Sequence, residues 1–284
     1  MTRIKIPNSY YIDLRGLEDF GYPRDADGLP LVGYGKKTGN RYNPITISQY
    51  GFYLLNRPRY HGIAIKCADW LVDNLKPWQQ SMYAWIYDFD LWFYGPRAPW
   101  ISAMAQGEGI SLLLRVFQLT GIEKYRETAK LAFTPFRYPV EENGIVDRIA
   151  DQSVFFEEYV THPPSHVLNG HIFALLGVYD YWRFFNDDDA ARLWQQGTNT
   201  IRQHWSRWDC GYWTWYDLYP VRRLASRMYH RLHIRLVKKL SELNEDTELS
   251  ALAERWHHML NHPVCVAKWL VFKSIEKIRI FLLK

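Results

Sequence analysis

Cysteine is scarce in this chain of 284 residues, which contains only Cys67, Cys210 and Cys265. Three cysteines so far apart form neither a disulfide framework nor a metal-binding pattern, and they suit a reducing compartment. The chain also lacks an uncharged apolar stretch of about 18 residues that could span a membrane. Its first residues lack the apolar run of a secretory signal peptide. We therefore expect a cytoplasmic protein without a transmembrane segment.

Several binding motifs are missing as well. The sequence has no zinc-ligand spacing, no glycine-rich phosphate loop and no RNA-binding signature of rings and glycines. A net charge of +5 favours a polyanionic partner, but these absences argue against nucleic acid as that partner. No dinucleotide-binding fingerprint occurs, and nothing identifies a metal site near Asp88, Asp90 or Asp147. We expect no cofactor and no bound metal.

Aromatic residues, in contrast, are abundant. The 13 Trp, 20 Tyr and 14 Phe residues make up 17% of the chain. Most of them are expected in the core, because each buried ring removes a large apolar area from water. A minority could stack against the flat CH faces of pyranose sugars.

Apolar residues recur at helical spacing in successive pairs of segments. Pro77, Gly121 and Pro135 end three of these segments, as expected of helix terminators. The predicted pairs are 45–55 with 63–75, 101–119 with 123–133, 165–182 with 190–205, and 228–240 with 249–260. Short alternating segments at 83–91, 155–159 and 212–216 are typical of strands or extended loops.

A weak internal repeat connects the first helices of these pairs. Gly51, Gly107 and Gly170 follow one another at intervals of 56 and 63 residues, which is typical of stacked helix hairpins. We predict a fold dominated by α-helices, an incomplete (α/α) toroid of about four helical hairpins, with short β-hairpins or extended loops lining a cleft. A helical bundle without a cleft is the alternative. The toroid domain is expected at 45–262, after an irregular N-terminal segment at 1–44.

The last segment, 263–284, is predicted to form a basic amphipathic helix. Apolar residues such as Trp269 and Ile275 alternate at helical spacing with Lys268, Lys273 and Lys277. Two binding partners are considered for the apolar side of this helix. One is the domain itself or a second copy of the chain, which would make a homodimer. The other is an anionic membrane, bound peripherally through residues 264–284.

Polar and aromatic side chains that could perform chemistry gather in three short segments. They are 156–159, then 215–219 with Arg222 and Arg223 behind it, and 227–233. On a helix, Tyr229 and His233 would share a face at i and i+4. Taken alone, each segment is also consistent with a strand edge, an aromatic loop or a capped helix start.

Longer motifs give a more specific signal. The sequence contains the runs NPI (43–45), APWISAMAQG (98–107), EEY (157–159), VLNG (167–170), LGVYD (176–180), YDL (216–218) and YH (229–230). In this order, the runs resemble motifs in the C-terminal domain of heparosan glucuronyl C5-epimerases. The resemblance covers roughly residues 40–260. It implies an α/α toroid that acts on glucuronate units of a heparosan-like anionic glycan.

The resemblance also implies roles for single residues. Glu158 matches the acidic catalytic position of the family, and Tyr229 matches its tyrosine on the opposite face of the sugar. Tyr159 and Tyr216 match tyrosines of the substrate cleft, and Glu157 stays open as an alternative acid. Substrate contacts are expected from Trp100, Gln106, Asn169, Arg222, Arg223, Arg227 and His230.

One position departs from the family pattern. The family carries an arginine three residues after the position of Tyr216, and this chain has Tyr219 there. Arg222 or Arg223 could contact the same substrate carboxylate. Which of them does so stays open.

The expected reaction removes the proton on carbon 5 of glucuronate, beside a carboxylate, and returns a proton from the opposite face. Hydrogen-bond donors must stabilise the second negative charge on that carboxylate, and two acid/base groups must flank the sugar. His230, Arg227 or Arg231 could stabilise a Tyr229 phenolate by charge. A polysaccharide lyase, an inactive glycan-binding protein and a glycoside hydrolase with two carboxylates stay open as alternatives.

Overall fold

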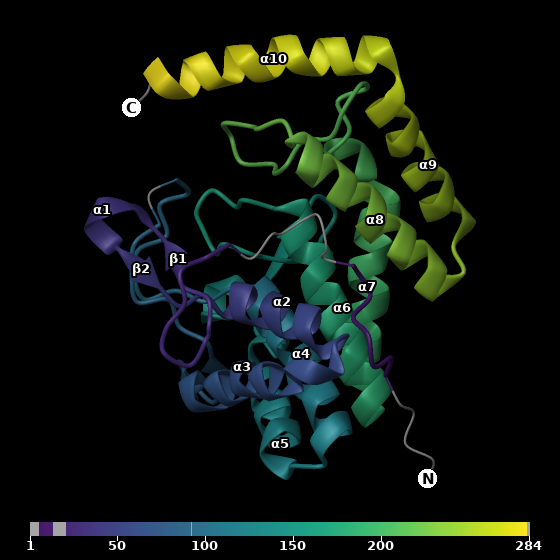
Figure 1. The fold of residues 1–284 in the computed structure, drawn as a ribbon. Coiled ribbons are helices and arrows are strands. Elements are labelled where there is room, and N and C mark those ends of the chain that lie inside the picture. Colours follow the sequence, from purple (N-terminus) through teal and green to yellow (C-terminus); the bar gives the residue numbers. More distant parts are fainter. Residues whose placement is uncertain (1–5, 14–20, 92, 283–284) are drawn as a thin grey trace.

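Helices dominate the computed structural model, which describes residues 6–13, 21–91 and 93–282 (Figure 1). The long helices are α2 (Pro44–Leu55), α3 (His61–Asn74), α4 (Ala103–Thr120), α5 (Glu123–Ala132), α6 (Leu168–Phe185), α7 (Asp188–His204), α8 (Arg227–Asn244), α9 (Thr247–Asn261) and α10 (Pro263–Leu282). Shorter helical segments are α1 (Gly35–Thr38), η1 (Pro58–Tyr60), η2 (Thr134–Arg137), η3 (Val140–Glu142) and η4 (Trp205–Arg207).

The strands form short antiparallel pairs. In the described residues these pairs are β1 (Val32–Gly33) with β2 (Asn40–Arg41), β3 (Lys76–Pro77) with β4 (Tyr83–Ala84), and β5 (Val146–Ile149) with β6 (Ser153–Phe156). In the longest ladder, Val146 lies opposite Phe156 and Ile149 lies opposite Ser153. This register brings the end of β6 to the first turn of α4, where the Ala103 amide donates to the Glu157 carbonyl.

The helices form four successive hairpins. Helix α2 packs on α3, α4 on α5, α6 on α7, and α8 on α9. The first helix of each hairpin also packs on the first helix of the next hairpin, in the order α2, α4, α6 and α8. These four helices therefore form the inner layer. The predicted architecture, an incomplete (α/α) toroid of about four hairpins, is therefore confirmed.

Small residues allow the inner helices to approach closely. A Cβ atom added to Gly177 of α6 would lie 2.3 Å from the Cα atom of Gly107 in α4. A Cβ atom added to Gly107 would lie 2.7 Å from the Cα atom of Ala174. Because both neighbours are backbone atoms, only glycine fits at these two positions. The close packing of α4 on α6 thus explains why Gly107, the second glycine of the internal repeat, is a glycine.

Capping residues set where the inner helices begin. The side chain of Asn43 accepts a hydrogen bond from Ile45 N, and Pro44 occupies the first turn of α2. Ser102 caps α4 by accepting from Ala105 N, and Ser226 caps α8 by accepting from Tyr229 N. These are standard N-cap interactions.

The predicted start of one helix is wrong. Helix α6 begins at Leu168 rather than at residue 165, because Ser165 donates its hydroxyl to Glu157 and His166 has a φ of 43°. The segment 212–216, predicted as a strand or an extended loop, is a loop with isolated bridges between Asp209 and Thr214 and between Trp215 and Leu224.

Within the described residues, no helix combines the length and the apolar character that crossing a membrane requires.

Candidate active site

Side chains from both ends of the sequence line one cavity of about 190 Å³ between the inner helices. All four residues predicted to be catalytic belong to its lining. The lining comprises Tyr22, Asn43, Ile45, Thr46, Gln49, Met104, Glu158, Tyr159, Asn169, Phe173, Tyr216, Met228, Tyr229 and Leu232. A larger cavity of about 370 Å³, at the opposite end of α2, shares none of these residues.

Glu158 is buried in the wall of this cavity, two residues after β6 ends. It packs against Gly170 of α6, where an added Cβ atom would lie 2.5 Å from the Glu158 Oε2 atom. Burial raises the pKa of Glu158 to about 7, while the interaction with the Tyr159 hydroxyl acts in the opposite direction. Its Oε2 atom has no hydrogen-bond partner in the protein. A buried acceptor without a partner is unusual, and this one belongs to a residue of the cavity wall.

Glu157 points away from this cavity. Its Oε2 atom accepts a hydrogen bond of 2.8 Å from the Ser165 hydroxyl, and the His166 amide donates to both carboxylate oxygens. Neighbouring residues of an extended chain project to opposite sides, so only one of the two glutamates can line the cavity. That residue is Glu158.

Glu157 belongs instead to a small buried network. His166 Nε2 lies 2.9 Å from Asp147 Oδ2 and 3.3 Å from Glu157 Oε1. One ligand-type atom from each of the three residues lies within 4.8 Å of the others. These groups contact one another directly, and the same three ligand atoms lie close enough together to hold a metal ion.

Four tyrosines, Tyr22, Tyr159, Tyr216 and Tyr229, line the same cavity. The rings of Tyr216 and Tyr229 meet edge to face, with centroids 4.7 Å apart. Tyr159 stacks on Tyr94 with centroids 4.8 Å apart. Burial raises the pKa values of Tyr159 and Tyr216 well above the ordinary value, and the nearby Glu158 charge adds to this shift. Both hydroxyls are therefore protonated donors at neutral pH.

A second cavity, of about 230 Å³, adjoins the first and shares Tyr216 and Tyr229 with it. Arg223 and Lys273 supply its positive charge. The Arg223 guanidinium lies 4.8 Å from the centroid of the Tyr216 ring and forms an ion pair of 2.7 Å with Asp217. Lys273 comes from α10, outside the four hairpins.

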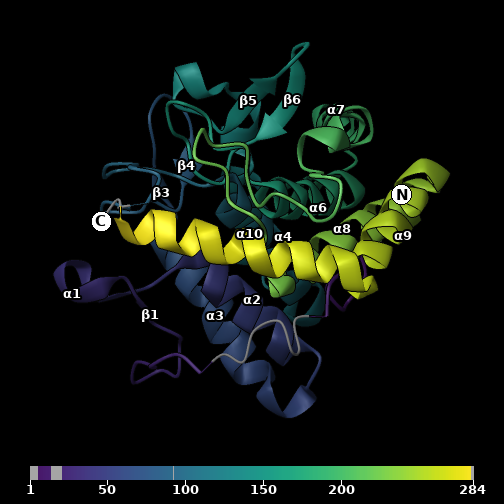
Figure 2. The same ribbon diagram turned by 90° about the horizontal axis from the view of Figure 1, so that it is seen from above.

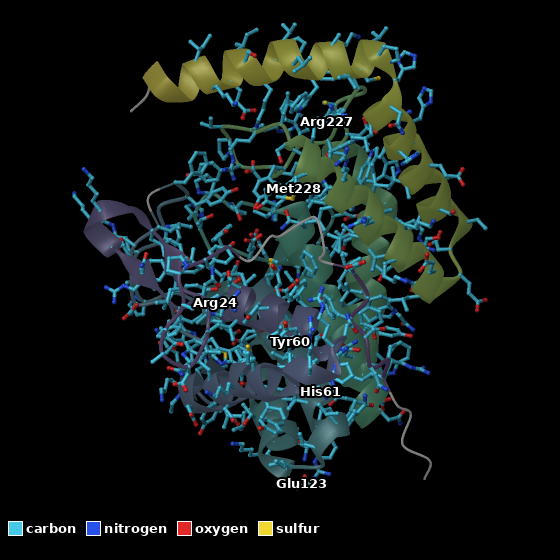
Figure 3. All side chains as sticks on the ribbon, in the orientation of Figure 1. Arg24, Tyr60, His61, Glu123, Arg227 and Met228 are labelled. Atoms are coloured by element: carbon cyan, nitrogen blue, oxygen red, sulfur yellow. The ribbon has the colours of Figure 1, made fainter. Side chains whose placement is uncertain are left out.

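Arg223, rather than Arg222, is therefore the arginine beside the tyrosines. Arg222 is exposed and packs over Trp215, with 5.9 Å between its guanidinium and the ring centroid. Tyr219, at the position of the family's arginine, packs edge to face on Tyr94. Arg227 is exposed at the first turn of α8, next to Met228 and between α10 and the helical body (Figure 3).

Three residues expected to contact substrate have structural roles instead. The Gln106 amide is fully buried and binds the backbone of Trp85, Tyr83 and Ala132. Trp100 stacks on Tyr87, with ring centroids 3.9 Å apart, and donates its indole N–H to the Phe89 carbonyl.

His230 is the third residue whose expected role changes. It is buried, its Nδ1 atom lies 2.8 Å from the Thr214 hydroxyl and its Nε2 atom lies 3.0 Å from the Trp256 carbonyl. Burial lowers the pKa of His230 to about 4. A neutral imidazole that faces away cannot stabilise a Tyr229 phenolate by charge, which corrects that part of the prediction.

Asn169 does lie in the cavity wall, and its buried Oδ1 atom has no partner. Nine further lining residues were not predicted as site residues, among them Asn43, Gln49, Tyr22 and Met228. Asn43 belongs to the NPI motif, which was a usable signal, and Gln49 follows shortly after that motif. Tyr22 and Met228 carried no such signal. Gln49 donates to Glu108, a buried carboxyl behind the cavity wall.

An incomplete α/α toroid whose cavity places one buried carboxylate among four tyrosines defines a class of protein with groups suited to acid–base chemistry between its inner helices. A family model described as D-glucuronyl C5-epimerase C-terminus matches residues 79–258. The chain belongs to this family.

Two relatives show how much of the chain is similar to known proteins. The chain is 33% identical over 210 residues to a D-glucuronyl C5-epimerase of Caenorhabditis elegans, covering 66% of this chain and 33% of that protein. It is 32% identical over 156 residues to an uncharacterised protein of Methanocaldococcus jannaschii, covering 54% and 50% of the two chains. The chain thus spans one third to one half of the length of these relatives.

Among solved structures, a glycoside hydrolase family 76 mannosidase of Bacteroides thetaiotaomicron is a distant match. Its TM-score is 0.43 at 15% sequence identity, over 81% of this chain and 63% of that one.

Proposed function

We propose that this protein is an epimerase that inverts carbon 5 of D-glucuronate residues to L-iduronate in a heparosan-like polysaccharide. The observation that carries the proposal is the shared cavity: Glu158 and Tyr229, distant in the sequence, line it together with Tyr159 and Tyr216. Membership of the C5-epimerase family supports the reaction type. The net charge of +5 supports an anionic glycan as the partner.

In this proposal, Glu158 and Tyr229 are the two acid/base groups, one on each face of the sugar. One takes the proton from carbon 5, and the other delivers a proton to the opposite face. The pKa of Glu158, about 7, suits this work, because a general acid/base is most effective when both of its forms are populated at the working pH.

The surrounding groups stabilise the charge that develops on the substrate carboxylate. The hydroxyls of Tyr159 and Tyr216 stay protonated and donate hydrogen bonds to it. Arg223, beside Tyr216 and paired with Asp217, supplies the cationic group that the family's arginine would supply. The orphaned Oδ1 atom of Asn169 accepts a hydrogen bond from a sugar hydroxyl.

The structure disfavours a glycoside hydrolase. Such an enzyme needs two carboxylates flanking the bond, about 5–5.5 Å or 6.5–9.5 Å apart. Glu158 is the single acidic residue among the side chains that line the 190 Å³ cavity in the described part of the chain.

The proposal is tested by incubating the protein with heparosan, or its N-sulfated form, in heavy water. NMR should show deuterium at carbon 5 and the appearance of iduronate. Glu158→Gln and Tyr229→Phe should each reduce the exchange rate at least about 100-fold, the typical contribution of one acid/base group. Glu157→Gln is the matched control, and it should retain most of the exchange if it folds.

Variants of Glu158 and Tyr229 that exchange as fast as the parent would contradict the assignment. A product that absorbs ultraviolet light would indicate a lyase, since elimination leaves an unsaturated sugar. Binding of the glycan without exchange in the parent protein would indicate an inactive glycan-binding protein.

A further inference from the structure

Helix α10 presents a stripe of large apolar side chains to solvent. Val264, Val271, Ile275 and Ile278 retain 55%, 58%, 55% and 61% of their accessible surface. Exposed apolar side chains that cluster in this way mark an interaction site. Viewed from above, α10 crosses one face of the molecule (Figure 2). Of the predicted basic helix, residues 283–284 and the side chains of 279–282 lie outside the described residues.

The opposite side of α10 is fixed to the domain by hydrogen bonds. The Trp269 indole donates to the Ala225 carbonyl at 3.0 Å, and the Lys273 ammonium donates to the Leu224 carbonyl at 2.5 Å. The Leu224 amide donates to Glu276 at 2.7 Å. These contacts determine which way the helix faces.

The two sides are related by helical geometry. The docked residues 269, 273 and 276 follow the spacing i, i+4 and i+7. The exposed residues 271, 275 and 278 repeat the same spacing two positions later, which is about 200° around the helix axis. The docking contacts therefore hold the apolar stripe outward, away from the domain core.

The charge on this outward side is positive. Lys268 is exposed within the stripe, whereas the exposed Lys277 lies two positions after Ile275, on the other side of the helix. Glu276, the acidic residue of the helix, faces inward and bonds Lys273 and the Leu224 amide. An exposed apolar stripe that includes a lysine and has no acidic side chain beside it suits the interface of an anionic membrane.

We propose that α10 binds an anionic lipid surface, with its apolar stripe at the boundary of the acyl chains and Lys268 at the headgroups. The charge pattern favours this partner over a second copy of the chain. Lys268 lies in the same stripe, one turn before Val271, so packing two stripes together would bring lysines of both copies close. No outward acidic side chain in the described part of α10 would offset their repulsion.

The test is sedimentation of the whole protein with vesicles. We expect binding to vesicles that contain phosphatidylglycerol, weaker binding to phosphatidylcholine alone, and a loss of binding as salt rises. The double variant Val271→Asp/Ile275→Asp should lose at least about tenfold in partitioning, because it places charges in the inserted stripe. Lys268→Gln should lose about fivefold on anionic vesicles, whereas Lys277→Gln, on the other side of the helix, should bind nearly like the parent.

The matched control is Leu119→Asp/Leu131→Asp, which changes two leucines of similar exposure, 45% and 41%, in the α4–α5 hairpin. It should bind vesicles like the parent. Equal binding to neutral and anionic vesicles, or none, would overturn the proposal. So would a dimer in sedimentation velocity that Val271→Asp/Ile275→Asp abolishes. Because none of these residues lines the catalytic cavity, the vesicle result is independent of the glycan assay.

Discussion

At the residue scale, the decisive feature is the different surroundings of two adjacent glutamates. Glu157 is held by Ser165 and His166, whereas Glu158 faces the cavity with one oxygen unpartnered. Burial raises the pKa of both to about 7. The cavity thus contains a carboxyl group whose charge changes near neutral pH, and this group should also make stability depend on pH.

We expect Glu158→Gln to stabilise the protein increasingly as pH rises from about 5 to about 8. The folded-state pKa, about 7, exceeds the ordinary value of 4.5. Protonated Glu158 therefore stabilises the folded state fully below pH 4.5, the pKa of the unfolded state. This stabilisation is lost as the pH rises through about 7, the pKa of the folded state. Glutamine has no charge to bury, so its advantage should reach at most about 3 kcal/mol.

Urea denaturation at several pH values measures this difference. Glu254→Gln, a change at an exposed glutamate of α9, is the matched control. A difference between Glu158→Gln and the parent that stays constant across the pH range would show that the carboxyl does not titrate near pH 7 in the folded protein.

At the scale of elements, the α4–α6 contact organises the site. Helix α6 carries Asn169 and Gly170 beneath Glu158, and α4 carries Met104 of the cavity wall. Gly107 and Gly177 allow their backbones to touch. The cavity therefore depends on a helix spacing that any larger residue would increase.

Gly177→Ala should destabilise the protein by about 1–3 kcal/mol, the usual cost of overpacking a core. The added methyl group would meet the Gly107 backbone at 2.3 Å, and a backbone cannot rotate away. Gly62→Ala in α3 is the control, because nothing lies within 4 Å of its added Cβ atom. It should stabilise the helix by about 0.5–1 kcal/mol. Equal unfolding free energies for the two variants would contradict the close-contact argument.

At the scale of the whole molecule, a buried ion pair connects the N-terminal segment to the inner helices. Arg115 of α4 lies 2.5 Å from Asp180 of α6, and both side chains are almost inaccessible. Ser111 and Tyr11 donate to the same carboxylate at 2.6 Å and 2.5 Å. Tyr11 belongs to the segment before α1, so this network joins parts of the chain that are 169 residues apart.

Asp180→Asn should therefore lower the unfolding free energy by about 3–5 kcal/mol, because it leaves Arg115 buried without a counter-charge. Asp189→Asn is the matched control. Its partner Arg192 is 68% exposed, and exposed ion pairs contribute at most about 1 kcal/mol. Denaturant titration of both variants gives the comparison, and similar losses for both would show that the buried pair is not a structural support.

The sequence by itself determined the helical hairpins and five of the residues that line the cavity. Helix periodicity, terminators and caps act over a few residues, so they are readable without a fold. The ordered motifs likewise identified Glu158, Tyr159, Tyr216 and Tyr229, which the fold then brought to one cavity.

Only the tertiary structure decided which polar groups face that cavity. Gln106, Trp100 and His230 lie in or beside the same motifs, yet their polar atoms bind backbone or a buried hydroxyl. The orientation of Glu157 against Glu158, and of Arg223 against Arg222, depends on contacts with residues distant in sequence. A motif specifies which residues are present, whereas the packing of separate segments determines the direction in which each side chain points.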